Sequence, residues 1–134
     1  MATAATRLRN FLLSQATLSN VGSRIYETKP AQNQGWPFIV LRRVSTENAD
    51  VLNGSVGDAP LFYGFSIECV SDKEVTANAV GDAVRTALHL YRGTFDDTTA
   101  KGCFVDSESL DINRFDDGSD DGAFARTLET RIFL

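Results

Sequence analysis

The chain has 134 residues, of which 43% are hydrophobic and 23% are charged, and its formal net charge is −5 at pH 7. This length and balance predict one globular domain over residues 1–134, large enough to bury a core without a metal or disulfide. The acidic excess argues against an independent DNA-binding role, which needs a basic surface. Met1 leads into a polar amphipathic segment, and no stretch has the roughly 20 apolar residues of a membrane span, so we expect folding in the cytoplasm without membrane contact.

The amino-terminal third predicts a helix and a short strand. Apolar residues recur at helical spacing over about Thr3–Gln15, which is typical of a helix covering one side of a core. A strand is expected at Arg24–Thr28, and the composition of Lys29–Gly35 predicts a loop.

Two longer strands are then predicted from alternation. The first begins near Phe38, with Val40 and Val44 on the same face, and the second covers Leu61–Val70 with a clean period of two. Between them Ser45–Pro60 is too long for an ordinary hairpin connection, so we expect a binding element that orders on docking. The candidate docking residues of this loop are Glu47, Asp50, Val51, Leu52, Val56 and Asp58.

The most clearly specified element is a long helix after the second of these strands. Ser71 and Glu74 have the spacing of a capping box, and Val70 and Val75 the spacing of a hydrophobic staple around it. Gly93 lies where a left-handed residue would end the helix. The predicted buried stripe is Ala77, Val80, Val84, Ala87, Leu88 and Tyr91.

Two further strands, about Lys101–Leu110 and Ala123–Phe133, complete the chain, joined by the acidic loop NRFDDGSDDG. The predicted order is α-β-β-β-α-β-β. This is an α+β domain in which an N-terminal helix and one long central helix pack against a mainly antiparallel sheet.

Few residues are arranged for catalysis or metal binding. His89, the only histidine, falls on the polar stripe of the long helix beside arginines, which favours a solvated surface position. Cys69 and Cys103 lie in predicted strands, which favours buried reduced thiols and leaves a disulfide as the alternative. We therefore expect no enzyme activity, no catalytic residue, no metal site and no cofactor.

The acidic loop matches a calcium-binding pattern in part. Residues 117–122 match the first six positions of an EF-hand loop, but the twelfth position is Leu128, where a bidentate glutamate is required. A solvated turn between two strands is the favoured interpretation, and a cation site is the alternative.

The order and spacing of several segments resemble one known family. The segments are Pro37–Leu41, Phe65–Cys69, Ala83–Leu88, Arg92–Phe95, Val21–Tyr26 and the strand ending Arg131-Ile132-Phe133. Together they resemble the small tail completion proteins of tailed bacteriophages, also described as tail terminators or tail-to-head joining proteins. The resemblance covers nearly the whole chain, although no single motif is specific.

The resemblance implies a virion structural protein that forms a ring, usually six-fold, at the head-proximal end of the tail. The implied partners are copies of the chain itself, the tail tube protein and a head-side connector or stopper, and DNA passes through the ring without specific binding. Like charge would keep DNA from the channel wall, which makes Asp116, Asp117, Asp120 and Asp121 the candidate lumen-facing residues. The adjacent Arg42 and Arg43 are the candidate subunit interface.

Two alternative functions stay open. The nearer one is another neck component, such as an adaptor, stopper or minor tail protein. The more distant one is a small-ligand-binding α+β domain, which would need a concave pocket lined by polar residues.

Overall fold

A computed structural model of the chain describes residues 3–27, 35–48, 61–114 and 122–134. The helical elements are α1 (Ala4–Leu13), a short 3-10 turn η1 (Ala16–Leu18) and α2 (Glu74–Leu88). The strands are β1 (Ile25–Glu27), β2 (Phe38–Asn48), β3 (Leu61–Ser71), β4 (Gly93–Phe95), β5 (Thr98–Ala100), β6 (Gly102–Arg114) and β7 (Gly122–Phe133).

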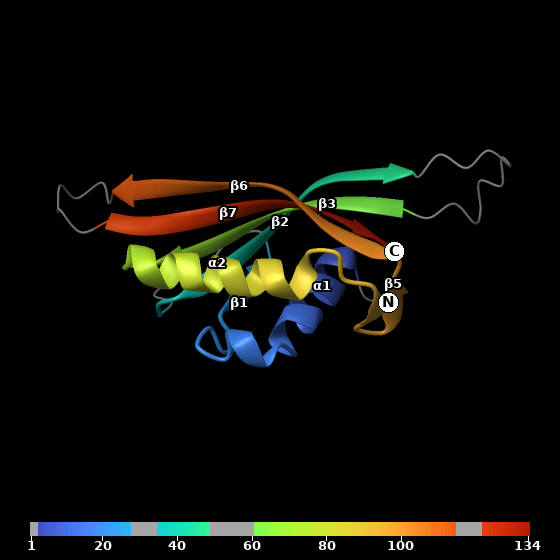
Figure 1. The fold of residues 1–134 in the computed structure, drawn as a ribbon, viewed down its shortest axis with the longest axis horizontal. Helices are drawn as coiled ribbons and strands as arrows, with labels where there is room; N and C mark the ends of the chain where they lie inside the picture. Colours follow the sequence, from blue (N-terminus) through green and yellow to red (C-terminus); the bar gives the residue numbers. More distant parts are fainter. Residues whose placement is uncertain (1–2, 28–34, 49–60, 115–121) are drawn as a thin grey trace, which may run out of the picture.

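The main sheet has five strands in the order β1-β2-β3-β7-β6. The β1–β2 pair is parallel and the three other pairs are antiparallel. Both helices lie on the same side of this sheet, as Figure 1 shows. The predicted α+β class, the mainly antiparallel sheet and the order of the main elements are therefore confirmed.

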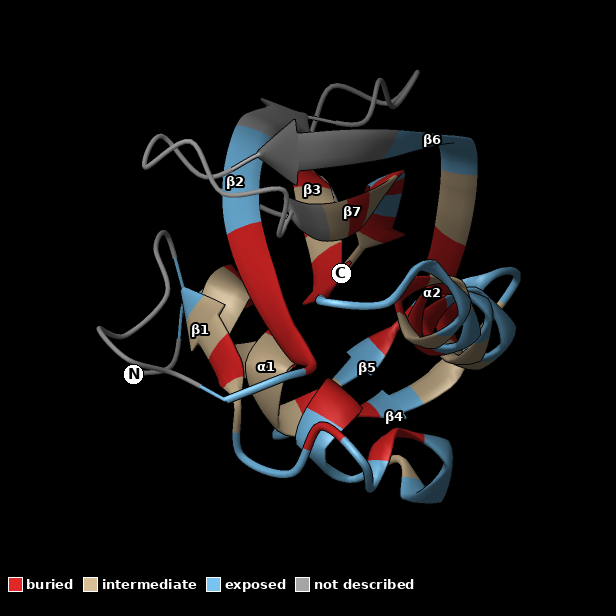
Figure 2. Cartoon of the chain, turned by 90° about the vertical axis from the view of Figure 1, so that its left-hand side faces the viewer, coloured by how far each residue is buried: buried red, intermediate tan, exposed pale blue. Residues whose placement is uncertain are grey.

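The core lies between the sheet and the two helices. Alternate residues of each strand point to this helix side, and the helices add their predicted apolar stripes. The sheet contribution to this core includes Ile39, Leu41, Phe65, Ile67, Leu128 and Ile132. Figure 2 shows β2 changing from buried to exposed partway along its length, at the point where Leu41 is followed by Arg42.

A smaller apolar cluster lies on the opposite face of the sheet. It consists of Phe38, Val40, Val70 and Ala125. The ring of Trp36 stacks on Phe38 with 5.5 Å between centroids. Because both faces of β2 are covered before Arg42, its residues there form a continuous hydrophobic run instead of an alternating one.

The structure corrects the end of β2. Ser45–Asn48, predicted as the start of the long loop, continue β2 and pair with Leu61–Gly64. The ladder contains a bulge between Arg43 and Ser45, so Val44 has no partner on β3 and is 65% exposed. Val44 therefore does not join Val40 in the apolar cluster, and the inserted residue breaks the period of two beyond it.

The predicted capping box and staple of α2 were also wrong. Ser71 is the last residue of β3, and its hydroxyl accepts the Lys73 N–H at 3.4 Å. Lys73 is the N-cap and supplies no side-chain hydrogen bond. Val75 is 80% exposed, so it forms no staple with Val70. Pairing of Ser71 with β7 prevails over the local capping preference.

The helix ends earlier than predicted. α2 stops at Leu88, and Leu90, with φ 64°, takes the left-handed conformation expected of Gly93. The Leu90 N–H donates to the Cys103 carbonyl at 2.7 Å, which fixes the turn against β6. Gly93 instead begins β4, the first strand of a two-stranded hairpin that sequence analysis missed.

Both cysteines are buried and unpaired, as the favoured interpretation predicted. Burial raises the pKa of each thiol from 9.0 to about 12. We expect neither thiol to react with a disulfide reagent at pH 8 until the protein unfolds, because the thiolate is the reactive form. Stopped-flow absorbance with and without denaturant measures this.

The same shift predicts an alkaline loss of stability. Since the folded-state pKa lies above the unfolded value, the stabilisation is complete below pH 9 and decreases as pH rises from there toward 12. A Cys69→Ala variant should show a shallower decrease over that window in urea titrations. Equal slopes for the variant and the parent protein would contradict this assignment.

Candidate assembly interface

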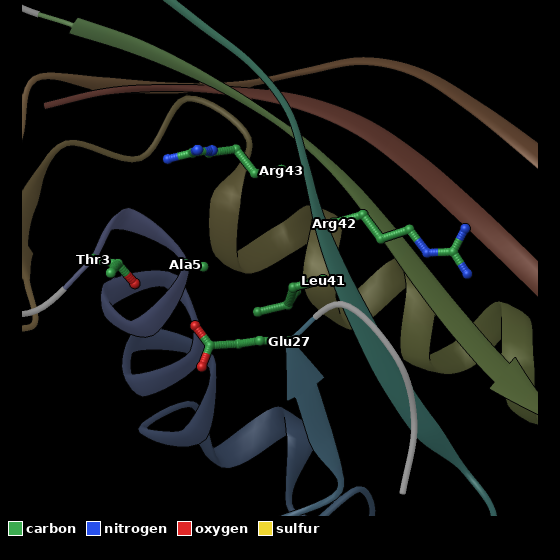
Figure 3. A pocket seen from close by; sticks show the side chains of 6 residues that line it. All are labelled: Thr3, Ala5, Glu27, Leu41, Arg42 and Arg43. Atoms are coloured by element: carbon green, nitrogen blue, oxygen red, sulfur yellow. The ribbon is translucent and has the colours of Figure 1, made fainter.

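Arg42 and Arg43 lie on opposite faces of β2, because consecutive strand residues alternate. Figure 3 shows their side chains pointing away from each other. Arg42 lies on the face away from the helices, where its Nη1 is 3.4 Å from Glu68 Oε1 on β3. The Arg42 side chain is 55% exposed, so this ion pair contributes little to folding and leaves the guanidinium accessible to a partner.

Arg43 borders an open groove of about 560 Å³ at the end of β1. The groove is also lined by Thr3 and Ala5 of the α1 end and by Glu27 of β1, as Figure 3 shows. The Thr6 hydroxyl donates to Glu27 at 3.1 Å, which holds that carboxylate at the α1 side. Within the described ranges no ion pair engages Arg43, so it is available to a neighbouring molecule.

Of the other predicted site residues, Glu47 alone lies in the part of the chain that the structure describes. Glu47 was assigned to the docking loop, but it lies in β2 opposite Phe62, so the loop begins beyond it and the docking role of Glu47 stays a prediction. The remaining docking residues (Asp50, Val51, Leu52, Val56 and Asp58) lie outside the described residues. So do the four candidate lumen residues Asp116, Asp117, Asp120 and Asp121.

β6, at the other edge of the sheet, carries acidic residues that sequence analysis did not single out. Asp106 accepts two hydrogen bonds from Arg131, at 2.8 and 3.1 Å, and Glu108 accepts one from Arg126 at 2.9 Å. Each carboxylate has unused acceptor positions, because an ionised carboxylate can accept about four hydrogen bonds. The part of β2 beyond β1 thus presents two arginines, and β6 presents two carboxylates that pair with arginines of β7.

The face of the sheet away from the helices holds a row of aromatic and basic side chains. Phe62 stacks on Phe133 with 4.3 Å between centroids, and the Arg131 guanidinium lies 5.9 Å from the Phe62 ring and 5.6 Å from the Phe104 ring. Lys101 lies 5.8 Å from the Phe133 ring. The period of two in β7, which puts Arg131 and Phe133 on one face, was the signal that could have identified this row.

His89 has the exposed position predicted for it, and it also has a structural role. Its Nδ1 accepts the Val105 N–H at 3.2 Å. Among the described residues, no group of three or more His, Cys, Asp or Glu side chains could hold a metal ion, and no helix is long and apolar enough to span a membrane.

These features define a small structural domain with an exposed sheet face and two charged sheet edges. A family model described as "Tail completion protein gp17" matches residues 6–124. The chain therefore belongs to the gp17 tail completion family and is a structural protein of a phage tail.

A solved structure with the same fold comes from a virus-like particle. The chain is similar to a protein in "Virion of native gene transfer agent (GTA) particle", with a TM-score of 0.68 and 19% identity. The match covers 97% of this chain and 92% of the other. At this identity the match establishes the fold alone. No curated protein matches the chain.

Proposed function

We propose that this protein is a tail terminator. Copies of it form a ring, of six subunits by analogy with the family, on the head-proximal end of the tail tube. The ring ends tube growth, presents a docking face to the head-side connector or stopper, and lets DNA pass. Assembly takes place in the host cytoplasm.

Membership of the tail completion family carries this proposal. The geometry of the described residues supports it, because a ring needs two different complementary patches on each subunit. The basic pair Arg42–Arg43 on β2 and the acidic pair Asp106 and Glu108 on β6 lie at opposite edges of one sheet.

Two finer assignments are part of the proposal. The carboxylates of Asp116, Asp117, Asp120 and Asp121 line the channel and repel DNA. Replacing all four by serine should then slow DNA ejection while leaving the ring intact, measured by fluorescence of released DNA and by electron microscopy. Ejection at the parental rate would remove the support for a lumen position.

The loop with Asp50, Val51, Leu52, Val56 and Asp58 docks on the tube or the connector. Limited proteolysis should cleave it faster in the free protein than in virions. Equal cleavage rates in the two states would contradict docking.

The role in tail assembly is tested with an early stop codon in this gene and electron microscopy of the lysate. We expect filled heads beside unattached tails of abnormal length, because nothing ends tube growth. Unattached tails of normal length would favour the second candidate, a joining or adaptor protein of the neck. Intact infectious particles would overturn both.

A further inference from the structure

β2 and β6 each have an outer side that is paired along only part of the strand. β1 pairs with Ile39–Leu41 of β2, and no described strand pairs with Arg42–Asn48 on that side. On β6, the Cys103 carbonyl accepts from Leu90 and the Val105 N–H donates to His89. Beyond Val105, no described strand or turn covers the outer side of Asp106–Arg114.

We propose that neighbouring copies of this chain join by pairing these two segments, so that Arg42–Asn48 of one copy continues the sheet beside Asp106–Arg114 of the next. The proposal rests on the ring of the proposed function and names its interface. The occupant of each open edge is a second copy of the chain.

Strand directions allow this pairing. From β2 through β3 and β7 to β6, each strand runs antiparallel to its neighbour, so β6 runs opposite to β2. Two copies in the same orientation therefore bring β6 of one beside β2 of the next as an antiparallel pair. Open strand edges expose unpaired backbone groups that such pairing satisfies.

The register within one subunit sets the offset between copies. Arg42 is level with Ser107, through Ser66 and Glu129 on the intervening strands. The open segments extend from this level in opposite directions, so their pairing shifts each copy along the strands by roughly four to five residues. Because each copy contributes the four strands β2, β3, β7 and β6 to the continuous sheet, the shift is about one residue per strand, as in closed barrels whose strands tilt by about 35–45°.

The faces of the sheet select the register. Residues that pair must point to the same side, since a slip by one residue inverts every side chain. Arg43, opposite Phe65, and Leu110, opposite Arg126, share the helix side. With Arg43 opposite Leu110, Glu108 of the neighbouring copy is the diagonal neighbour of Arg43, within reach of its long side chain.

Charge makes the pairing selective. With Arg43 opposite Leu110, Arg42 lies opposite Asp111 and Arg43 lies diagonal to Glu108, so opposite charges meet at this end of the pairing. Because it joins two different segments, the contact is head-to-tail, the type of contact from which rings are built, and not a two-fold dimer contact.

Cross-linking in assembled tails tests the interface, with Arg43→Cys and Leu110→Cys combined in one chain. Within a subunit these positions lie on β2 and β6, which β3 and β7 separate, so a disulfide can form only between copies. Mild oxidation should link the copies by disulfides into a ladder of multimers on a denaturing gel. A reducing agent should convert these multimers back to monomers. Cys69 and Cys103 are buried and do not compete. The matched control combines Leu110→Cys with Ala79→Cys, an exposed position on α2, and should give no ladder.

Hydrogen exchange of the unmodified protein tests the same contact without a mutation. Amides of Arg42–Asn48 and Asp106–Arg114 should exchange at least tenfold more slowly in tails than in the free chain. Tails that contain a ring of this protein but show neither the ladder nor the slower exchange would overturn the edge pairing while leaving the proposed function intact. Tails that lack the protein would overturn both.

Discussion

A Gly81→Val variant is expected to lose about 2–4 kcal/mol of unfolding free energy, because the Arg126 side chain occupies the space beside Gly81. A Cβ atom at Gly81 would lie 2.5 Å from Cδ and 2.8 Å from Nε of Arg126. No real Cβ contact is so short, so either the helix or the arginine must move.

Arg126 is held too firmly to move at low cost. Its Nη1 donates to the Asn78 carbonyl at 2.8 Å and to Asp82 at 2.6 Å, and its Nη2 donates to Glu108 at 2.9 Å. Burial lowers the pKa of Arg126, but the hydrogen bonds to Asp82 and Glu108 outweigh burial and raise that pKa above its ordinary value. The guanidinium therefore stays charged and ties α2 to β6 and β7.

A double-mutant cycle in urea measures this coupling. Gly81→Ala should destabilise the parent protein, although alanine favours a helix over glycine by about 1 kcal/mol. In an Arg126→Ala background the same change should be neutral or stabilising, because the clash is gone. Ala79→Val, at an exposed position of α2, is the control for helix propensity. Additive effects of the Gly81 and Arg126 changes would contradict the clash.

A Phe95→Ala variant is expected to lose about 3–5 kcal/mol, since it leaves a cavity under the amino-terminal helix. The Phe95 side chain is fully buried and stacks on Phe11 of α1, with 4.7 Å between ring centroids. Phe11 in turn lies 4.8 Å from the ring of Tyr91. The hairpin β4–β5 thus anchors α1 through the Phe95 ring, in addition to the Arg7–Asp97 ion pair and the hydrogen bond from Asn10 to Asp96 at its turn.

Urea titration of three variants separates this role from a general effect of losing a phenylalanine. Phe95→Leu should cost less than Phe95→Ala because it refills part of the cavity. Phe104→Ala, on the half-exposed face of β6, should cost about 1–2 kcal/mol. A loss at Phe104 as large as that at Phe95 would show that the cost at Phe95 is the general cost of removing a phenylalanine and would contradict a special anchoring role.

The parts of the fold that could be predicted from sequence are those that local pattern determines. The alternation in Leu61–Val70 and the apolar stripe of α2 identified their elements correctly. Ser45–Asn48 were misassigned because pairing with β3, and not composition, makes them a strand. The capping role given to Ser71 failed for the same reason, since its backbone pairs with Phe124.

Only the basic half of the candidate interface could be predicted from the sequence. Arg42 and Arg43 could be identified because they are adjacent basic residues in the sequence. Asp106 and Glu108 matter because β6 is an edge strand, and strand order depends on long-range pairing that no local pattern records. The bulge that leaves Val44 unpaired was hidden for the same reason.

The position of β7 has a consequence for synthesis on the ribosome. Within the sheet β6 pairs only with β7, and β7 separates it from β3, although β7 is the last of these strands to be translated. Until Gly122–Phe133 emerges, β3 and β6 lack their common neighbour. Such distant pairings form slowly. If subunits join by the edge pairing proposed above, a nascent or prematurely terminated chain cannot offer both sheet edges at once, and only finished subunits are competent to enter the assembly.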